Sequence, residues 1–278
     1  MSDHRPIGVF DSGLGGLTVV RAIMDELPFE SILYFGDQAR FPYGPRPLEE
    51  IRGFALDIAA HLIEQDVKMI VIACNAATSA ALADVAQAVP VPVIGVVEPA
   101  VRAAIRGTRN RRVGLIGTEA TVRSRSYDGA LALVDPRKQI ALFSRACPRF
   151  VEFVERGDTT SDELLDVARS YLAPLQDAGI DTLILGCTHY PLLRGAIHHV
   201  MGPEVLLLSS AEETANDVYS ALAEAEIQAD GTELPTHRFE SSGEPELFGV
   251  LGRRFLGPEF KEAVQVSLSP SGAAPTWS

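Results

Sequence analysis

The sequence predicts an α/β fold of two similar doubly wound domains, each built on a mainly parallel sheet. Two observations predict this fold. Short runs of β-branched and other apolar residues alternate with amphipathic helical patterns along most of the chain. The alternation then restarts after Glu98 and Pro99, which indicates a second α/β unit. A length of 278 residues with 46% hydrophobic residues is enough to build both cores.

The first unit contains four expected strands. Each is a short apolar run bounded by polar residues, glycine or proline: residues 6–10, 31–35, 68–73 and 91–96. Helical patterns separate these runs and begin near Leu14, after Pro47 and near Ala77. Because each strand is followed by a helix, successive strands are expected to run parallel.

The second unit repeats this order. Its expected strands are residues 112–118, 139–144, 182–187 and 204–210, with helices between them, including a helical stretch from about Pro148 to Ala178. A helix from Ala211, a short strand at 237–243 and a further helix follow. These last elements are too few for a core of their own, so we expect them to pack against the first unit.

The order of elements predicts a discontinuous first domain. We expect residues 1–98 and 209–264 to form the first α/β domain and residues 99–208 to form the second. Residues 265–278 are rich in serine, proline and glycine without periodicity, which predicts a disordered and dispensable tail.

Composition excludes several classes of function. A formal net charge of −13 argues against a nucleic-acid partner, which usually requires a basic surface. Three cysteines without a C-x-x-C pair form neither a disulfide framework nor a zinc motif, and reduced thiols fit a cytoplasmic protein. The chain shows no export signal and no apolar run of the roughly 20 residues that a membrane helix needs. We expect a cytoplasmic protein without a membrane partner.

The segment GVFDSGLGGLT at residues 8–18 places Asp11 and Ser12 at the end of a strand. The glycines that follow allow a ligand to approach the backbone at a helix amino terminus, where carboxylates and phosphates are both favoured. Gly13, Gly15 and Gly16 do not have the spacing of a dinucleotide-binding fingerprint, so a plain tight turn is the main alternative to a ligand site.

Cys74 and Cys187 occupy matching places in the two units. Each follows an expected strand and precedes a helix, where amide donors and the helix dipole favour a thiolate. Ligands of open α/β sheets bind at such strand ends. A single buried cysteine is often only a small apolar side chain, but two at equivalent positions favour chemistry. Cys147 precedes Pro148 without polar neighbours and is assigned to packing.

Further polar candidates follow other strands. Pro42, Tyr43 and Gly44 form a loop that would present a phenol and backbone donors, although a proline–glycine turn alone explains it. Thr118 and Thr121 can bind a carboxylate or cap the next helix. His189 can orient or protonate a neighbouring group, or simply lie solvated at a helix start. Two further histidines have no closed zinc spacing with Cys187, so no metal site is expected: His198 and His199.

Two thiols that face each other across a cleft suit one kind of chemistry. A thiolate that removes a proton from carbon leaves a planar carbanion, and a thiol on the opposite side can return a proton and invert the centre. A hydrolase would need one nucleophile with an oriented base, and a disulfide oxidoreductase would usually keep its cysteines close in sequence. Racemisation is therefore the reaction that this pair favours.

Seven motifs in this order give the chain a specific resemblance. They are GVFDSGLGGLTV, PYGP, VIACNAATSA, GTEATV, CPRFVEFVERG, LGCTHYPLL and SSAEETA, and the matching region runs from about Pro6 to Pro258. The chain resembles bacterial glutamate racemases of the aspartate/glutamate racemase superfamily. The resemblance implies interconversion of L-glutamate and D-glutamate without a cofactor, for peptidoglycan synthesis. It also implies a homodimer, with the active site of each chain in the cleft between its two α/β domains.

The resemblance also implies roles for individual residues. Cys74 and Cys187 would be the two acid/base residues, and the carboxylate and imidazole groups that assist them would belong to Asp11, His189 and Glu155. The substrate would be bound by residues in the loops and at the strand ends, namely Ser12, Pro42, Tyr43, Gly44, Asn75, Ala76, Thr118, Thr121 and Thr188.

One position departs from the family pattern. Related sequences commonly have a threonine directly after the Cys-Asn pair, where this chain has Ala76. The loss of that hydroxyl is expected to weaken binding by about 0.5–1.5 kcal/mol, while the backbone N–H can still donate. It leaves open an aspartate racemase or a broad acidic amino-acid racemase. A non-catalytic protein that binds a basic partner is a further alternative, against which both thiols argue.

Overall fold

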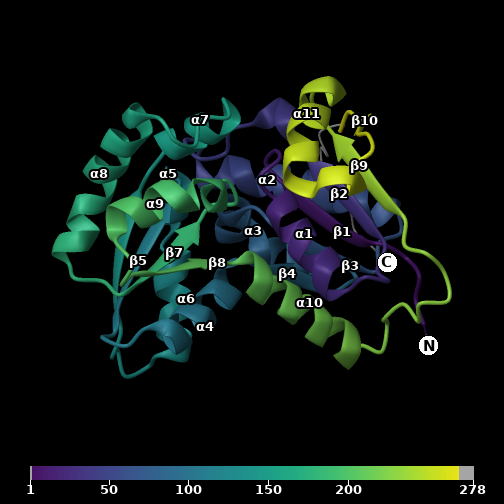
Figure 1. Cartoon of the computed structure of the whole chain (residues 1–278). Helices are drawn as coiled ribbons and strands as arrows, with labels where there is room; N and C mark the ends of the chain where they lie inside the picture. The colour runs from purple at the N-terminus through teal and green to yellow at the C-terminus, as the bar shows by residue number, and fades with distance from the viewer. Residues whose placement is uncertain (1, 269–278) are drawn as a thin grey trace.

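The computed structural model describes residues 2–268, which form two lobes (Figure 1). The first lobe contains a six-stranded sheet in the order β10-β9-β2-β1-β3-β4, and every neighbouring pair is parallel. Its strands are β1 (Ile7–Asp11), β2 (Ile32–Gly36), β3 (Met69–Ile72), β4 (Val93–Gly95), β9 (His237–Ser241) and β10 (Val264–Gln265).

The second lobe contains a four-stranded parallel sheet in the order β6-β5-β7-β8. Its strands are β5 (Arg112–Gly117), β6 (Ala141–Ala146), β7 (Thr182–Gly186) and β8 (Leu206–Ser209). The predicted α/β fold with two parallel sheets is therefore confirmed. The exact division into residues 1–98 with 209–264 and residues 99–208 stays a prediction.

Helices cover both faces of each sheet. In the first lobe α1 (Leu17–Glu26), α10 (Ala211–Glu224) and α11 (Pro245–Leu256) pack on one face, and α2 (Leu48–Glu64) and α3 (Asn75–Ala88) pack on the other. In the second lobe α7 (Arg149–Glu155), α8 (Asp162–Asp177) and α9 (Arg194–Met201) cover one face. The other face is covered by α4 (Val97–Gly107) and α6 (Ser126–Val134). The short helices are α5 (Glu119–Ser124), η1 (Gln38–Arg40), η2 (Tyr190–Leu193) and η3 (Gly257–Glu259).

The C-terminal elements return to the first lobe, as predicted. Figure 1 shows α11 and β9, in yellow, beside the purple N-terminal strands. β9 pairs with β2, and β10 pairs with β9 at the sheet edge. Gln265 therefore belongs to a strand and Val266 packs on the core, so the expected disordered tail does not begin at residue 265. The remainder of that tail, residues 269–278, lies outside the described residues.

Two helix starts differ from the sequence expectation. α1 begins at Leu17 instead of Leu14, because residues 14–16 still belong to the glycine-rich turn. α3 begins at Asn75, two residues before the expected Ala77. The reason is that Cys74 acts as the amino-terminal cap of α3, a role in which its sulfur replaces the usual hydroxyl or carboxylate oxygen.

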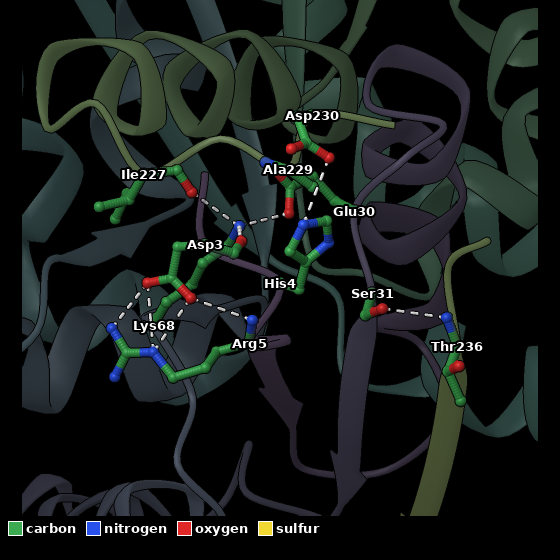
Figure 2. Close-up of polar contacts among 10 residues, drawn as sticks. All are labelled: Asp3, His4, Arg5, Glu30, Ser31, Lys68, Ile227, Ala229, Asp230 and Thr236. Carbon is green, nitrogen blue, oxygen red and sulfur yellow. Dashed lines mark hydrogen bonds and ion pairs between the residues drawn. The ribbon is translucent and has the colours of Figure 1, made fainter. Parts of the chain in front are cut away.

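A buried ion pair lies at the amino ends of the strands in the first sheet (Figure 2). Lys68 Nζ lies 2.6 Å from Glu30 Oε2, and the two side chains are 0% and 3% exposed. The ammonium group also donates to the Asp3 carbonyl at 2.5 Å and to the Ile227 carbonyl at 2.8 Å. The Glu30 carboxylate accepts from the Ala229 N–H at 2.9 Å. This cluster thus ties the N-terminal segment and the chain after α10 to the starts of β2 and β3.

Candidate active site

A cavity of about 390 Å³ lies at the carboxyl ends of the strands and is lined by both lobes. It contains both cysteines that the sequence singles out, Cys74 after β3 and Cys187 after β7. The other lining residues are Ser12, Phe41, Pro42, Tyr43, Gly44, Pro45, Asn75, Ala76, Thr118, Glu119, Pro148, Val151, Glu152, Glu155, Thr188 and His189. Two thiols that follow strands of different sheets therefore line one cavity.

Cys74 lies in surroundings that keep its thiol neutral. Its Sγ accepts a hydrogen bond from the Ala77 N–H at 3.5 Å, and its S–H donates to Ser12 Oγ at 3.6 Å. Burial raises the pKa of the Cys74 thiol well above its ordinary value, and the charge of Asp11 raises it further. The Cys74 thiol is therefore protonated at neutral pH.

Cys187 lies beside a histidine. His189 Nδ1 is 3.9 Å from Cys187 Sγ, and His189 Nε2 is 2.7 Å from Glu155 Oε1 on α7. Burial by itself lowers the pKa of His189, but its contacts with Cys187 and Glu155 outweigh that effect and raise the pKa to about 10. The ring is therefore cationic at neutral pH and attracts negative charge to the neighbouring sulfur. The two thiols thus have opposite electrostatic surroundings.

The raised pKa of His189 predicts how stability changes with pH. The pKa of His189 is about 10 in the folded chain and 6.5 in the unfolded chain. Its contribution to the free energy of unfolding is therefore complete below pH 6.5 and is lost as the pH rises to about 10. Urea unfolding should show the wild type losing more stability across this range than His189→Asn. His199→Asn, which changes an exposed histidine of α9, should follow the wild type. Equal pH slopes for all three proteins would contradict the cationic assignment.

Asp11 lies one layer behind the cavity. Its side chain is completely buried, and burial raises the pKa of its carboxyl group. The Gly13 N–H donates to Asp11 Oδ2 at 3.2 Å, and Thr188 Oγ1 donates to Asp11 Oδ1 at 3.3 Å. Because Thr188 belongs to the second lobe, this contact joins the two lobes directly behind the thiols.

Gly15 permits the close approach of the lobes at this point. A Cβ at Gly15 would lie 2.3 Å from Thr188 Oγ1 and 2.6 Å from His189 Nδ1. Real atoms do not approach so closely, so any side chain there must displace Thr188 and the His189 ring, or the backbone. The glycine is therefore needed for its lack of a side chain.

Gly15→Ala is accordingly expected to lower kcat/KM by about 100-fold, because a displacement of about 1 Å in a catalytic group has an effect of this size. The measurement is steady-state racemisation kinetics together with a thermal unfolding scan. Gly53→Ala on α2 is the matched control, since a Cβ there would contact nothing within 4 Å. An unchanged rate in Gly15→Ala would show that His189 does not need its present position.

Asn75 presents an unpaired atom beside the cavity. It is the first residue of α3 and is 2% exposed. Its Nδ2 donates to the Tyr127 hydroxyl of α6 at 2.8 Å, while its Oδ1 has no partner among the residues that the structure describes. Ala76 follows and contributes only a methyl group and backbone to the lining. The unpaired acceptor therefore belongs to a residue of the cavity lining.

Comparison with known proteins identifies the family. The family model described as Asp/Glu/Hydantoin racemase matches residues 7–218. The chain belongs to this racemase family. It is 54% identical to the glutamate racemase of Saccharopolyspora erythraea over 255 residues, which cover 92% of this chain and 93% of that protein.

Solved structures agree with this assignment. The racemase superposes on a glutamate racemase of Bacillus anthracis with a TM-score of 0.91 and 41% identity, covering 96% of this chain and 98% of the other. It superposes on the glutamate racemase of Francisella tularensis in complex with D-glutamate with a TM-score of 0.88 and 38% identity, covering 95% and 98%. The chain is therefore an amino-acid racemase with the fold of these enzymes.

Tyr43 lines the cavity of the racemase. Its phenol donates a hydrogen bond to Asp37 Oδ2. Arg40 Nε contacts the same carboxylate oxygen at 2.6 Å, and Ser242 Oγ donates to Asp37 Oδ1 at 2.8 Å. Tyr43 therefore stabilises the loop that carries Pro42 and Gly44, and its role in substrate binding stays a prediction. Sequence reasoning did not single out Asp37, although this residue directly follows β2.

The two candidate threonines of the racemase have different positions. Thr118 lines the cavity and caps α5, since its Oγ1 accepts from the Thr121 N–H at 3.3 Å. Thr121 is buried behind it, with its Oγ1 3.0 Å from Thr118 Oγ1, and is not part of the lining. Gly44 of the first lobe contacts the second lobe, because its carbonyl accepts a hydrogen bond from the Ala120 N–H at 2.9 Å. Thr118 thus caps α5 and also lines the cavity, and its role in substrate binding stays a prediction.

Several functional candidates were missed by sequence reasoning. Phe41, Glu119, Pro148, Val151 and Glu152 line the cavity, and only the proximity of some of them to recognised motifs could have indicated this. Cys147 is completely buried and lies outside the lining.

Among residues 2–268, no cluster of three or more His, Cys, Asp or Glu side chains is arranged to hold a metal ion. In the same range, no helix combines the length and apolar character needed to cross a bilayer.

Proposed function

We propose that this racemase interconverts L-glutamate and D-glutamate without a cofactor, with Cys74 and Cys187 as its two acid/base residues. The observation that carries the proposal is that the two thiols come from different sheets, line one cavity and have opposite electrostatic surroundings. The glutamate racemases at 54% and 41% identity support the choice of substrate.

The proposed reaction needs one thiolate and one thiol. The thiolate removes the Cα proton, and the electron pair of the broken C–H bond remains on a planar carbanion. The opposite thiol then donates its proton to the other face, so a new C–H bond forms and the second sulfur becomes the thiolate. The Cys187 sulfur beside cationic His189 suits the first state, and neutral Cys74 suits the second. The reverse reaction begins from the exchanged protonation states.

Donors and acceptors around the thiols suit an amino acid with two carboxylates. Ser12 offers a hydroxyl donor, Thr188 lines the cavity while its hydroxyl donates to Asp11, and Asn75 Oδ1 is an unpaired acceptor. Preorganised donors of this kind stabilise the charge that develops on the α-carboxylate in the transition state. We therefore propose that these residues bind the substrate, while Asp11, His189 and Glu155 assist the thiols.

A deuterium experiment tests the proposal. In D₂O without added cofactor, D-glutamate and L-glutamate should each lose optical activity while deuterium enters Cα. Circular dichroism follows the first change and mass spectrometry follows the second. The absence of both changes would favour a binding protein of this fold over an enzyme.

Aspartate is the second candidate substrate, because Ala76 removes a hydroxyl from the lining. The same assay with L-aspartate compares the two directly. Faster turnover of aspartate would transfer the assignment to an aspartate racemase.

The cellular setting is also part of the proposal. The described cysteines, Cys74, Cys147 and Cys187, are all free thiols, as suits a reducing cytoplasm. We propose a cytoplasmic homodimer that supplies D-glutamate for peptidoglycan, on the strength of the family resemblance.

A further inference from the structure

Tyr127 lies outside the cavity lining but contacts a residue within it. The side chain comes from α6 in the second lobe and is 1% exposed. Its hydroxyl accepts a hydrogen bond from Asn75 Nδ2 in the first lobe at 2.8 Å. The Asn75 amide, which lies next to Cys74 in the chain, is thus held by a phenol from the opposite lobe.

In the structure this contact occupies the donor end of the amide. A carboxamide has a donor end and an acceptor end, and the orientation of the group follows from its hydrogen bonds. With Nδ2 bonded to Tyr127, the acceptor Oδ1 is left buried and unpaired among the described residues. An unpaired buried acceptor is costly until a donor reaches it. The donor that an amino acid brings into this cavity, and that a plain dicarboxylate lacks, is its ammonium group.

The Tyr127 hydroxyl can keep its hydrogen bond to Asn75 across the neutral pH range. Burial raises the pKa of its phenol well above the ordinary value, so the group does not ionise near neutral pH. The hydroxyl lies beside Gly186, where an added Cβ would be 3.4 Å from it. It therefore sits between the segment that carries Cys74 and the segment that carries Cys187.

We propose that Tyr127 is a positioning residue that holds the Asn75 amide with its oxygen toward the α-ammonium group of the substrate. The proposal rests on glutamate racemisation, as proposed above, and assigns one part of its substrate recognition. Tyr127 acts only through Asn75. Because the two residues belong to different lobes, the ammonium site is complete only when the lobes are packed together.

The test compares ligands with and without an amino group. In Tyr127→Phe the ring remains and the hydroxyl is lost, so KM for L- and D-glutamate should rise about five- to tenfold, the effect of one hydrogen bond. The kcat should change by less than about twofold, because the contact is made in both ground and transition states. Inhibition by glutarate, which has both carboxylates but no ammonium group, should keep the wild-type Ki.

Ser126→Ala is the matched control. Ser126 is adjacent to Tyr127, and its Oγ contacts Ser79 Oγ across the same boundary at 2.7 Å, away from the cavity lining. This variant should retain the wild-type KM and Ki. If glutarate binding weakens in Tyr127→Phe as much as glutamate binding, the residue acts on packing in general and the proposal is overturned. An unchanged KM overturns it as well.

A double variant keeps the test independent of any folding defect in Tyr127→Phe. If Tyr127 acts only through Asn75, adding Tyr127→Phe to Asn75→Ala should not raise KM further, whereas independent effects would multiply and overturn the proposal. Wild-type protein without glutamate racemisation would instead refute the proposed function, before any variant is compared.

Discussion

Replacement of either Cys74 or Cys187 by serine is expected to lower kcat/KM for racemisation by about 1000-fold, which lies within the range of general acid–base catalysis. Serine retains the size of the side chain but is a far weaker acid, so proton transfer to or from the carbanion slows. The measurement is loss of circular dichroism from L- and D-glutamate. Full activity in either variant would refute the two-thiol mechanism.

Thermodynamics sharpens this prediction. Enantiomers have equal free energies, so kcat/KM for the two directions must be equal in the wild type and in every variant. A single missing thiol therefore has to slow both directions by the same factor. Proton exchange is different, because the remaining thiol can still remove and return a proton on its own face. Each serine variant should exchange the Cα proton of one enantiomer only, and the favoured enantiomer should differ between the two variants.

Cys147→Ser is the control for the cysteine variants. This thiol is also buried, but it lies outside the cavity, and burial raises the pKa of its thiol well above the ordinary value. It should reduce stability while leaving kcat/KM of the folded enzyme near that of the wild type. Loss of racemisation in Cys147→Ser would place a third thiol in the reaction.

Glu30→Gln is expected to destabilise the fold by about 3–5 kcal/mol, the effect of leaving a buried charge without its partner. Lys68 is completely buried, and two carbonyls would remain as its only polar contacts in the cluster of Figure 2. Urea unfolding provides the free energy. Because this cluster lies at the amino ends of the strands, kcat/KM of the folded fraction should be unchanged.

The double variant Glu30→Gln with Lys68→Met should recover most of the lost stability, because no buried charge remains. The exposed pair Arg169 and Asp166 offers a comparison, and Arg169→Gln should change stability by no more than about 1 kcal/mol. Losses of similar size in Glu30→Gln and Arg169→Gln would mean that the ion pair of Lys68 is not effectively buried.

The sequence by itself determined the two parallel sheets and the two thiols. Both follow from local patterns, since β-branched runs and helical periodicity select the element type, and a strand end fixes where Cys74 and Cys187 emerge. The motifs in order also determined the family, which the comparison confirmed.

Tertiary structure alone decided how these residues are coupled. Tyr127 reaches Asn75, Glu155 reaches His189, and the phenol of Tyr43 turns to Asp37, and none of these contacts has a signal in the local sequence. The unlike surroundings of the thiols likewise arise from burial and from charges on other elements. The physical reason is that hydrogen bonds and pKa values depend on distances of a few ångströms. Only the packing of segments far apart in the chain sets those distances.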